Sequence, residues 1–245
     1  MTVPKTHPRY KSLTTRNKIV GGVIKEITSV HGLIAHGRGE AFDYILKEKT
    51  NEFAIKSIQA AASLLLLANH PIISINGNSA ALVPKNLIKL SKTLQCPLEI
   101  NIFHTSSKRE IRIKKFLIKK GANKNSILLP QKDYTLKHLD SNRKFINKNG
   151  INKSDVVFIP LEDGDRASAL IKNNKKVITI DLNPMSRTSQ TSTISIVDNI
   201  TRTLPLLNKT VLQYKNKSEK ELKNILKNYN NKKNLSDSIK KIKKL

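Results

Sequence analysis

Short apolar runs alternate along the chain with longer segments whose apolar residues recur at helical spacing. The runs are rich in β-branched residues and have the length of buried strands; they fall at 71–76, 97–103, 126–130, 155–160, 176–181 and 193–198. Helical spacing is found at 53–69, 79–95, 108–121, 164–173 and 199–213. This alternation predicts an α/β fold, a doubly wound and mostly parallel sheet with helices on both faces.

Both ends of the chain depart from the alternation. A helical segment is expected near 11–21, and we include it in a single α/β domain over residues 1–214. Residues 215–245 form a basic tail in which Leu222, Ile225 and Leu226 recur at helical spacing. Such a tail suits a partner or a membrane surface, but we interpret it as a solvated appendage, helical or flexible.

The formal net charge of +27 makes a basic nucleic-acid-binding protein on an α/β fold an alternative, since basic surfaces release counterions from phosphate backbones. Residues 105–153 contain 14 basic and 3 acidic side chains, whereas residues 155–205, which contain the polar motifs described below, contain 6 of each. This distribution favours a solvated lysine surface, and we expect no specific nucleic acid partner.

The single cysteine, Cys96, excludes an internal disulfide and a cysteine-based zinc site. The longest apolar run, at 60–68, is far shorter than a membrane span, and the first residues lack an apolar signal region. We therefore expect a soluble, cytoplasmic protein with no membrane partner.

Ligands of doubly wound sheets bind beyond the carboxyl ends of strands, so the residues after each strand are the first candidates for a site. Asn76, Gly77 and Asn78 follow the first strand and precede a helix. Amides at a helix start favour the phosphate or carboxylate of a substrate. An ordinary strand–helix turn with Asn as the cap explains the same residues, and taken alone it is the better explanation.

Two later strand ends are also polar. Asp163 and Asp165 lie in "PLEDGDRASAL" (160–170) and could hold Mg²⁺ or complement the dipole of the following helix. The stretch "DLNPMSRTSQTSTISIVDN" (181–199) places a carboxylate at each of two strand ends, with an arginine and hydroxyls between them. Carboxylates suit ribose hydroxyls and arginine suits phosphates, so this stretch predicts a nucleotide site.

The glycines of "GLIAHGRGEAFDYIL" (32–46) indicate a loop. No P-loop and no G-x-G-x-x-G fingerprint occurs in the chain, which weakens a second alternative, an oxidoreductase on the same fold.

Several long motifs resemble the archaeal phosphopantothenate synthetase family, the 4-phosphopantoate–β-alanine ligases. They are "HPRYKSLTTRNKIVGG", "GLIAHGRGEAFDYILKEKT", "ISINGNSAALVP", "PLEDGDRASAL" and "DLNPMSRTSQTSTISIVDN". The resemblance runs from about residue 4 to 213 and leaves out the tail after 215.

The resemblance implies a homodimer with a Rossmann-like core. It also implies an ATP-dependent ligase of coenzyme A biosynthesis, which joins 4-phosphopantoate to β-alanine through an acyl-adenylate and releases AMP and pyrophosphate. ATP and Mg²⁺ would be the cofactors. The implied ATP-contacting residues are Arg16, Arg38, Asp181, Leu182, Asn183, Arg187, Thr188, Asp198 and Asn199.

Given this resemblance, we interpret the segment 32–46 as a phosphate loop. Its glycines would bring backbone amides close to phosphate, and Arg38 would supply the charge that acts in catalysis. His36 would contact phosphate or the reacting carboxylate. The alternative for His36 is a loop histidine bonded to the backbone, and both explanations stay open here.

Overall fold

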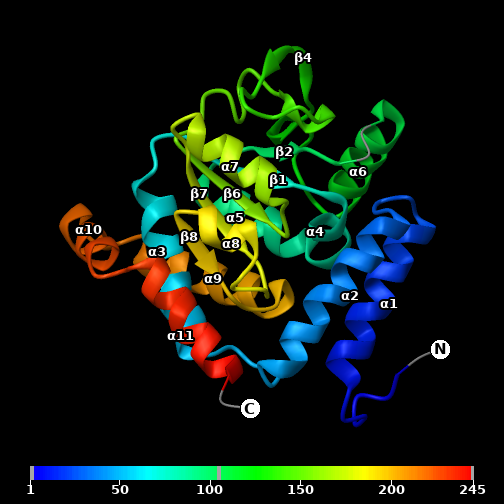
Figure 1. Ribbon diagram of the computed structural model, residues 1–245. Coiled ribbons are helices and arrows are strands. Elements are labelled where there is room, and N and C mark those ends of the chain that lie inside the picture. The colour runs from blue at the N-terminus through cyan, green and yellow to red at the C-terminus, as the bar shows by residue number, and fades with distance from the viewer. Residues whose placement is uncertain (1–2, 104–105, 244–245) are drawn as a thin grey trace.

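The computed structural model describes residues 3–103 and 106–243 and contains a parallel sheet between layers of helices (Figure 1). The strand order is β3-β2-β1-β6-β7-β8. These strands are β1 (Pro71–Ile75), β2 (Leu98–Ile100), β3 (Ile127–Leu128), β6 (Val156–Pro160), β7 (Lys176–Ile180) and β8 (Ile194–Ile196). Every strand predicted from the sequence is confirmed, and all the pairings in this sheet are parallel.

The chain runs outward from β1 to β3 and then returns to β6 on the other side of β1. This reversal makes the boundary between β1 and β6 the switch point of a doubly wound sheet, so the predicted fold class is confirmed. An antiparallel pair, β4 (Gln131–Thr135) and β5 (Phe145–Ile146), lies between β3 and β6 in the sequence and was not predicted.

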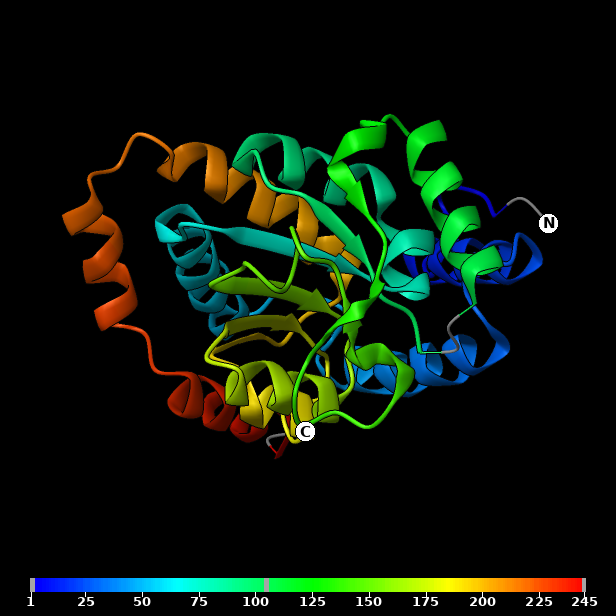
Figure 2. The same ribbon diagram turned by 90° about the horizontal axis from the view of Figure 1, so that it is seen from above.

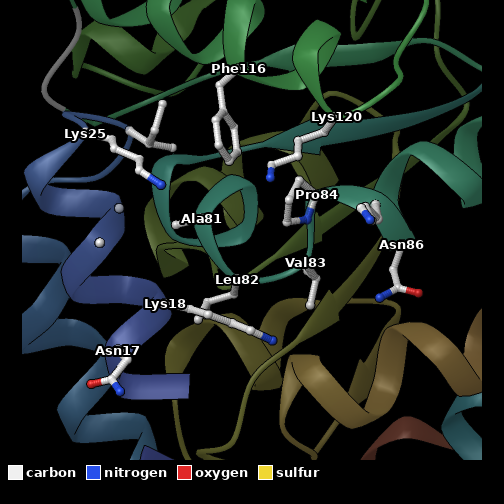
Figure 3. A pocket seen from close by; sticks show the side chains of 14 residues that line it. Asn17, Lys18, Lys25, Ala81, Leu82, Val83, Pro84, Asn86, Phe116 and Lys120 are labelled. Carbon is white, nitrogen blue, oxygen red and sulfur yellow. The ribbon is translucent and has the colours of Figure 1, made fainter. Parts of the chain in front are cut away.

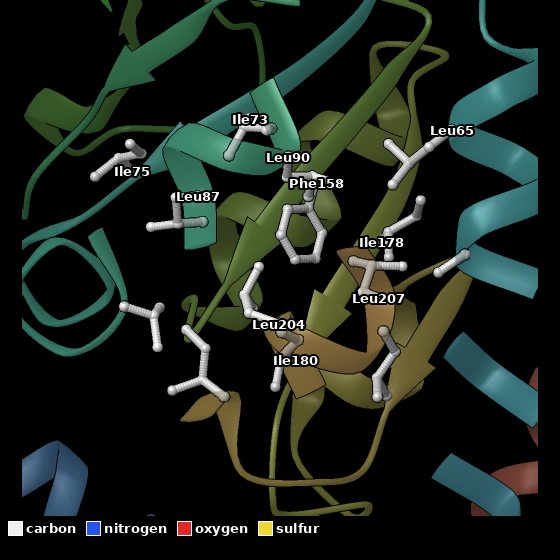
Figure 4. Close-up of a cluster of buried hydrophobic side chains, with 14 of the residues drawn as sticks. Leu65, Ile73, Ile75, Leu87, Leu90, Phe158, Ile178, Ile180, Leu204 and Leu207 are labelled. Atoms are coloured by element: carbon white, nitrogen blue, oxygen red, sulfur yellow. The ribbon is translucent and has the colours of Figure 1, made fainter. Parts of the chain in front are cut away.

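The sheet is buried on both faces, because alternate residues of each central strand enter different apolar clusters. Phe158 and Ile178 pack with α5 and α9 on one face (Figure 4). Val157 and Val177 pack on the other face, where α7 and α8 lie (Figure 2). The helices around the sheet are α3 (Glu52–Leu67), α4 (Gly77–Leu82), α5 (Pro84–Leu94), α6 (Ser107–Lys119), α7 (Gly164–Lys172), α8 (Arg187–Thr191) and α9 (Ile200–Tyr214), with short 3₁₀ turns at Lys124–Ser126 and Asn142–Lys144.

Helices α1 (Tyr10–Ile24) and α2 (Val30–Ile45) come before α3 in the chain. The predicted helix near 11–21 is confirmed, but the predicted loop at 32–46 is wrong, because α2 runs through it. The Ser29 side chain caps α2 by accepting the Gly32 N–H. Glycine is needed at 32 for close packing, since any Cβ there would overlap the side chains of Asn78 and Thr28.

The tail forms two helices, α10 (Glu219–Lys227) and α11 (Asn231–Lys243), that pack on α3. Leu222 and Leu235 are only 5% and 2% exposed. Asn231 accepts the backbone N–H of Ser195 at 2.9 Å and so covers the edge of β8. The tail is helical, as one of the two predicted alternatives had it, but its interpretation as a solvated appendage is wrong. Across the described ranges, no helix is both long and apolar enough to cross a bilayer.

Glu99 on β2 is the most deeply buried carboxyl of the sheet. Its two oxygens accept the backbone N–H groups of Asn147 at 3.1 Å and Ile151 at 2.7 Å. Burial nevertheless raises the pKa of Glu99 from 4.5 to about 7. The unfolded chain therefore releases this proton at lower pH than the folded chain does, and the stability that Glu99 contributes is lost as the pH rises through this interval.

The first prediction concerns the tail. Truncation after Gln213 should destabilise the fold, because it exposes the α3 surface under α10 and α11. The single change Leu235→Ala should lower the free energy of unfolding by roughly 2–5 kcal/mol, measured by chemical denaturation. Leu212→Ala, at an exposed position of α9, is the matched control and should change little. Equal effects of the two changes would contradict the packed tail.

The second prediction concerns Glu99. Between pH 4.5 and about 7, the wild type should lose stability relative to Glu99→Gln by on the order of 3 kcal/mol. The glutamine cannot titrate, although it sacrifices one of the two backbone contacts at every pH. Unfolding free energies of both proteins across this range provide the measurement. Parallel curves would show that Glu99 does not titrate in this interval.

Candidate active site

Helix α2 lies against the carboxyl ends of β7 and β8. An added Cβ at Gly39 would be 3.5 Å from Cδ1 of Leu182. The Asn199 side chain donates to Oδ2 of Asp43 on α2 at 2.8 Å. The positive charge of Arg38 also acts on Asp181. The structure therefore brings together α2 and both polar strand ends that the sequence indicated.

A buried ion network fixes α2 in this place. Arg202 of α9 donates to Asp198 (2.9 Å) and to Asp43 (3.2 Å), and Thr50 donates to the other oxygen of Asp198 at 2.6 Å. Burial acts to lower the pKa of Arg202, but the two carboxylates together raise it. Asp198 is thus committed to protein contacts, and Asp43, Thr50 and Arg202 are residues of the site that the sequence interpretation missed.

Asp181 is partly buried and directly follows β7. It accepts the hydroxyl of Ser186 and, at 2.9 Å, the backbone N–H of Asn183. Burial raises the pKa of Asp181, and the Ser186 hydrogen bond and the charge of Arg38 oppose the shift. Arg38 itself is exposed and forms no hydrogen bond or ion pair with the residues that the structure describes.

Arg187 and Thr188 begin α8 and connect it to the end of β6. Thr188 donates to the carbonyl of Glu162 at 2.8 Å. Arg187 pairs with Asp165, and its stem covers Gly164, where an added Cβ would lie 2.6 Å from the Arg187 Cβ. Arg187 remains largely exposed, so its guanidinium can reach a ligand only by leaving Asp165 or by binding both.

Arg16 of α1 and His36 of α2 meet at Glu40. Arg16 donates to Glu40 at 2.8 Å, and Nε2 of His36 lies 3.8 Å from the same carboxylate. The His36 side chain is 10% exposed, and its Nε2 has no hydrogen-bond partner among the described residues. Burial lowers the pKa of His36 although Glu40 opposes it, which favours the neutral imidazole. His36 is on a helix, so the loop explanation for it is wrong.

A cavity of about 940 Å³ lies beside this cluster. It is bounded by the start of α1, by α2 and by the start of α9. Of the residues implied to contact ATP, Arg16 and Asn199 line it, together with Asp43, Glu40 and Arg202. The residues after β8 reach this cavity and those after β7 do not line it; a space of this size can hold a ligand as large as a nucleotide.

The residues predicted after β1 serve the fold. Asn76 caps α4 and donates to the carbonyls of Pro160 and Leu161 at 3.0 and 2.8 Å, which ties β1 to β6 at the switch point. Asn78 accepts the Thr28 hydroxyl and donates to the carbonyl of Gly32. An added Cβ at Gly77 would lie 2.7 Å from the Ile27 carbonyl oxygen. These contacts match the strand–helix turn explanation.

The carboxylates predicted for Mg²⁺ face arginines. Asp163 accepts a hydrogen bond from Arg143 at 2.9 Å, and Asp165 pairs with Arg187. Within residues 3–103 and 106–243, no three His, Cys, Asp or Glu side chains gather as a metal site. Guanidinium groups repel a cation that would replace them, so these residues do not fit a protein-held Mg²⁺.

A second buried network, also missed from the sequence, lies beneath Asp163. Glu162 is enclosed by Arg143 and Arg166, and Arg166 also donates to Ser74 of β1 at 3.0 Å. Burial acts to raise the pKa of Glu162, but the two arginines hold it below its ordinary value. Arg143 further binds Asn101 after β2. The network joins the ends of β1, β2 and β6.

The chain is similar to known proteins along nearly its whole length. The family model described as phosphopantothenate/pantothenate synthetase matches residues 53–245. A relative from Thermococcus kodakarensis is 46% identical over 98% of this chain and 91% of its own length, and one from Methanosarcina mazei is 45% identical over 98% and 94%. Both relatives are named 4-phosphopantoate–beta-alanine ligase.

The family match includes the tail after residue 215, which lies outside the motifs that first suggested the resemblance. This agrees with the packing of α10 and α11 on α3. The chain therefore belongs to the phosphopantothenate/pantothenate synthetase family.

Proposed function

We propose that this protein is an ATP-dependent ligase that joins the carboxyl group of 4-phosphopantoate to the amine of β-alanine. The name shared by relatives at 45–46% identity supports the substrates. The observation that carries the proposal in the structure is the packing of α2, the helix that bears Arg38, against the segment after β7, where an added Cβ at Gly39 would lie 3.5 Å from Leu182. The nucleic-acid alternative has no support beyond the net charge.

In this proposal, ATP binds between α2 and the ends of β7 and β8. Asp181, Leu182 and Asn183 would contact the nucleoside on one side and Asp198 and Asn199 on the other. Both strand-end carboxylates accept hydrogen bonds, Asp181 from Ser186 and Asn183 and Asp198 from Arg202 and Thr50, but only Asp198 is held in an ion pair with the residues that the structure describes. Asp181 is therefore the better placed of the two to accept ribose hydroxyls.

The phosphates would be bound by Arg16, Arg38 and Arg187. Arg16 and Arg187 each have a carboxylate partner, Glu40 and Asp165, and would exchange or share it on binding. Arg38 has no such partner among the described residues, so its binding to phosphate breaks no existing contact. Mg²⁺ is expected to be held by the phosphates of ATP, because Asp163 and Asp165 do not fit it.

The proposed reaction has two steps. A carboxylate oxygen of 4-phosphopantoate attacks the α-phosphorus of ATP, which forms the acyl-adenylate and releases pyrophosphate. The amine of β-alanine then attacks the acyl carbon, the C–O bond to AMP breaks, and the amine loses a proton. Guanidinium groups fixed before the reaction stabilise the anionic charge of the first transition state. His36, neutral and with an unpartnered Nε2, is proposed to contact phosphate or the reacting carboxylate.

We also propose a cytoplasmic location, in keeping with an ATP-dependent biosynthetic enzyme.

We propose further that the protein is a homodimer, formed through the outer surface of α1 and α2. Val20, Ile24, Val30 and Ile34 are large apolar residues exposed on these two helices. Val20 and Ile24 lie one helical turn apart on α1, and Val30 and Ile34 one turn apart on α2. Exposed apolar faces of this kind are typical of protein interfaces. Sedimentation should show a dimer for the wild type and a monomer for Ile34→Glu; a wild-type monomer would contradict the proposal.

The direct test of the ligase is product identity. With ATP, Mg²⁺, 4-phosphopantoate and β-alanine supplied together, AMP and pyrophosphate should accumulate in step with 4′-phosphopantothenate. Chromatography of the nucleotides gives the measurement. ADP as the sole nucleotide product would instead indicate an acyl-phosphate and would sink the adenylate mechanism.

The role of Arg38 is tested by Arg38→Lys. Lysine keeps the positive charge but lacks the planar guanidinium group, which can donate two parallel hydrogen bonds to phosphate. We expect kcat to fall roughly ten- to a hundredfold, the scale of a charge-assisted hydrogen bond made in the transition state, while ATP affinity falls less. The melting temperature should hold, since Arg38 is exposed. Arg112→Lys on α6, an arginine paired with Glu26, is the control and should keep full turnover. Near wild-type kcat for Arg38→Lys would remove Arg38 from the reaction.

A further inference from the structure

A separate pocket of about 380 Å³ opens between α1, α4, α5 and α6 (Figure 3). None of the residues proposed to bind ATP, substrate or metal lines this pocket. It lies beyond the carboxyl-terminal end of α4, at the turn where Pro84 starts α5. The proposed ligase reaction therefore gives it no function.

The floor of the pocket is apolar. Ile27, Leu82 and Val83 are almost fully buried beneath it, and Pro84 and the ring of Phe116 form its inner walls (Figure 3). A ligand lying on this floor would bury hydrocarbon surface.

The rim of the pocket is cationic. Lys18, Lys25, Lys85 and Lys120 line it, and its lining contains no Asp or Glu. None of the four lysines forms an ion pair with the described residues. The Lys120 ammonium lies 5.4 Å from the centre of the Phe116 ring, which places a charge directly above the apolar wall (Figure 3).

The fold keeps this pocket open. An added Cβ at Gly22 would lie 2.7 Å from the Ala81 Cβ, so α1 and α4 cross closely there. At Gly21, one residue earlier, an added Cβ would meet nothing within 4 Å. The acidic residue that follows Lys25, Glu26, is bound by Arg112 of α6, and this ion pair joins α6 to the end of α1.

We propose that the pocket binds a small phosphate monoester with an aliphatic body. Several unpaired lysines match a phosphate dianion better than a single carboxylate, because lysine binds phosphate as a point charge. The apolar floor requires a hydrocarbon portion, and the volume is well below that of the 940 Å³ cavity beside α2. The ligand is either the ligase's own phosphorylated substrate or product, or another aliphatic phosphate of the cell.

Titration calorimetry with hexyl phosphate tests the pocket while a non-hydrolysable ATP analogue saturates the nucleotide site. The wild type should bind hexyl phosphate and should bind inorganic phosphate at least about tenfold more weakly, because inorganic phosphate lacks the apolar portion. Gly21→Leu places a side chain in the pocket at a position where an added Cβ meets nothing within 4 Å, and it should abolish binding at an unchanged or higher melting temperature. Absence of wild-type binding, or full binding by Gly21→Leu, would overturn the proposal.

A second arm tests the charge. Lys85→Gln combined with Lys120→Gln should weaken hexyl phosphate binding roughly three- to tenfold and reduce its salt dependence. Lys89→Gln, an exposed lysine on α5 that lies outside the pocket, is the matched control and should bind as the wild type does. Equal binding by all three proteins would show that the rim does not recognise the anion.

A third experiment, which rests on the proposed ligase function, distinguishes the two possible ligands: the ligase's own phosphorylated substrate or product, and another aliphatic phosphate. A KM for 4-phosphopantoate that rises in Gly21→Leu assigns the pocket to the substrate, whereas an unchanged KM assigns it to a different phosphate. The calorimetric arms involve no turnover, so a failure of the ligase proposal would leave the binding result standing, and a failure of binding would leave the ligase intact.

Discussion

The site depends on one buried interaction, the guanidinium of Arg202 held between the carboxylates of Asp43 and Asp198. Asp43 belongs to α2 and Asp198 to the end of β8, so this contact fixes an N-terminal helix onto the edge of a sheet built much later in the chain. Removing Arg202 would leave two buried carboxylates without their counter-charge, which is costly. The position of Arg38 relative to the segment after β7 follows from the position in which α2 is held.

Other contacts position the same helix from its opposite end. Asn78 binds the carbonyl of Gly32, and the lack of a side chain at Gly32 lets α2 begin directly against α4. Asn76 in turn connects β1 to the end of β6. The strand–helix turn after β1 therefore acts on the site indirectly, because the Asn76 and Asn78 side chains bind the backbone and place α2 relative to the sheet.

The strands and the fold class could be predicted from the sequence, because a parallel strand that is buried on both faces is encoded as a short apolar run rich in β-branched residues. A strand that is exposed on one or both faces lacks this apolar run and is not predicted, as at β4, whose residues are mostly exposed and polar. The glycines of α2 were misread for a related reason. Glycine permits a loop, but Gly32 is required here by a neighbour 46 residues away, and no local pattern contains that information.

The candidate site was predictable to the extent that it lies at strand ends. Asp181, Asp198 and Asn199 were found by that rule, and the structure places α2 beside all three. The partners that orient them were not found, because Asp43 and Arg202 are 159 residues apart and each alone has the pattern of an ordinary helical surface residue. The same holds for the tail. Its sequence shows the amphipathic spacing of a helix, but it does not show that α3 provides the surface on which this helix packs.

The central claim is that the Asp43–Arg202–Asp198 network acts on the reaction by holding Arg38 in place. A double-mutant cycle in kcat/KM with Arg38→Ala and Asp43→Asn tests it, with melting curves to confirm that each protein is folded. If the network works through Arg38, Asp43→Asn should reduce kcat/KM on its own but add little once Arg38 is already alanine. Losses that multiply in the double variant would contradict the account, because Asp43 would then act independently of Arg38.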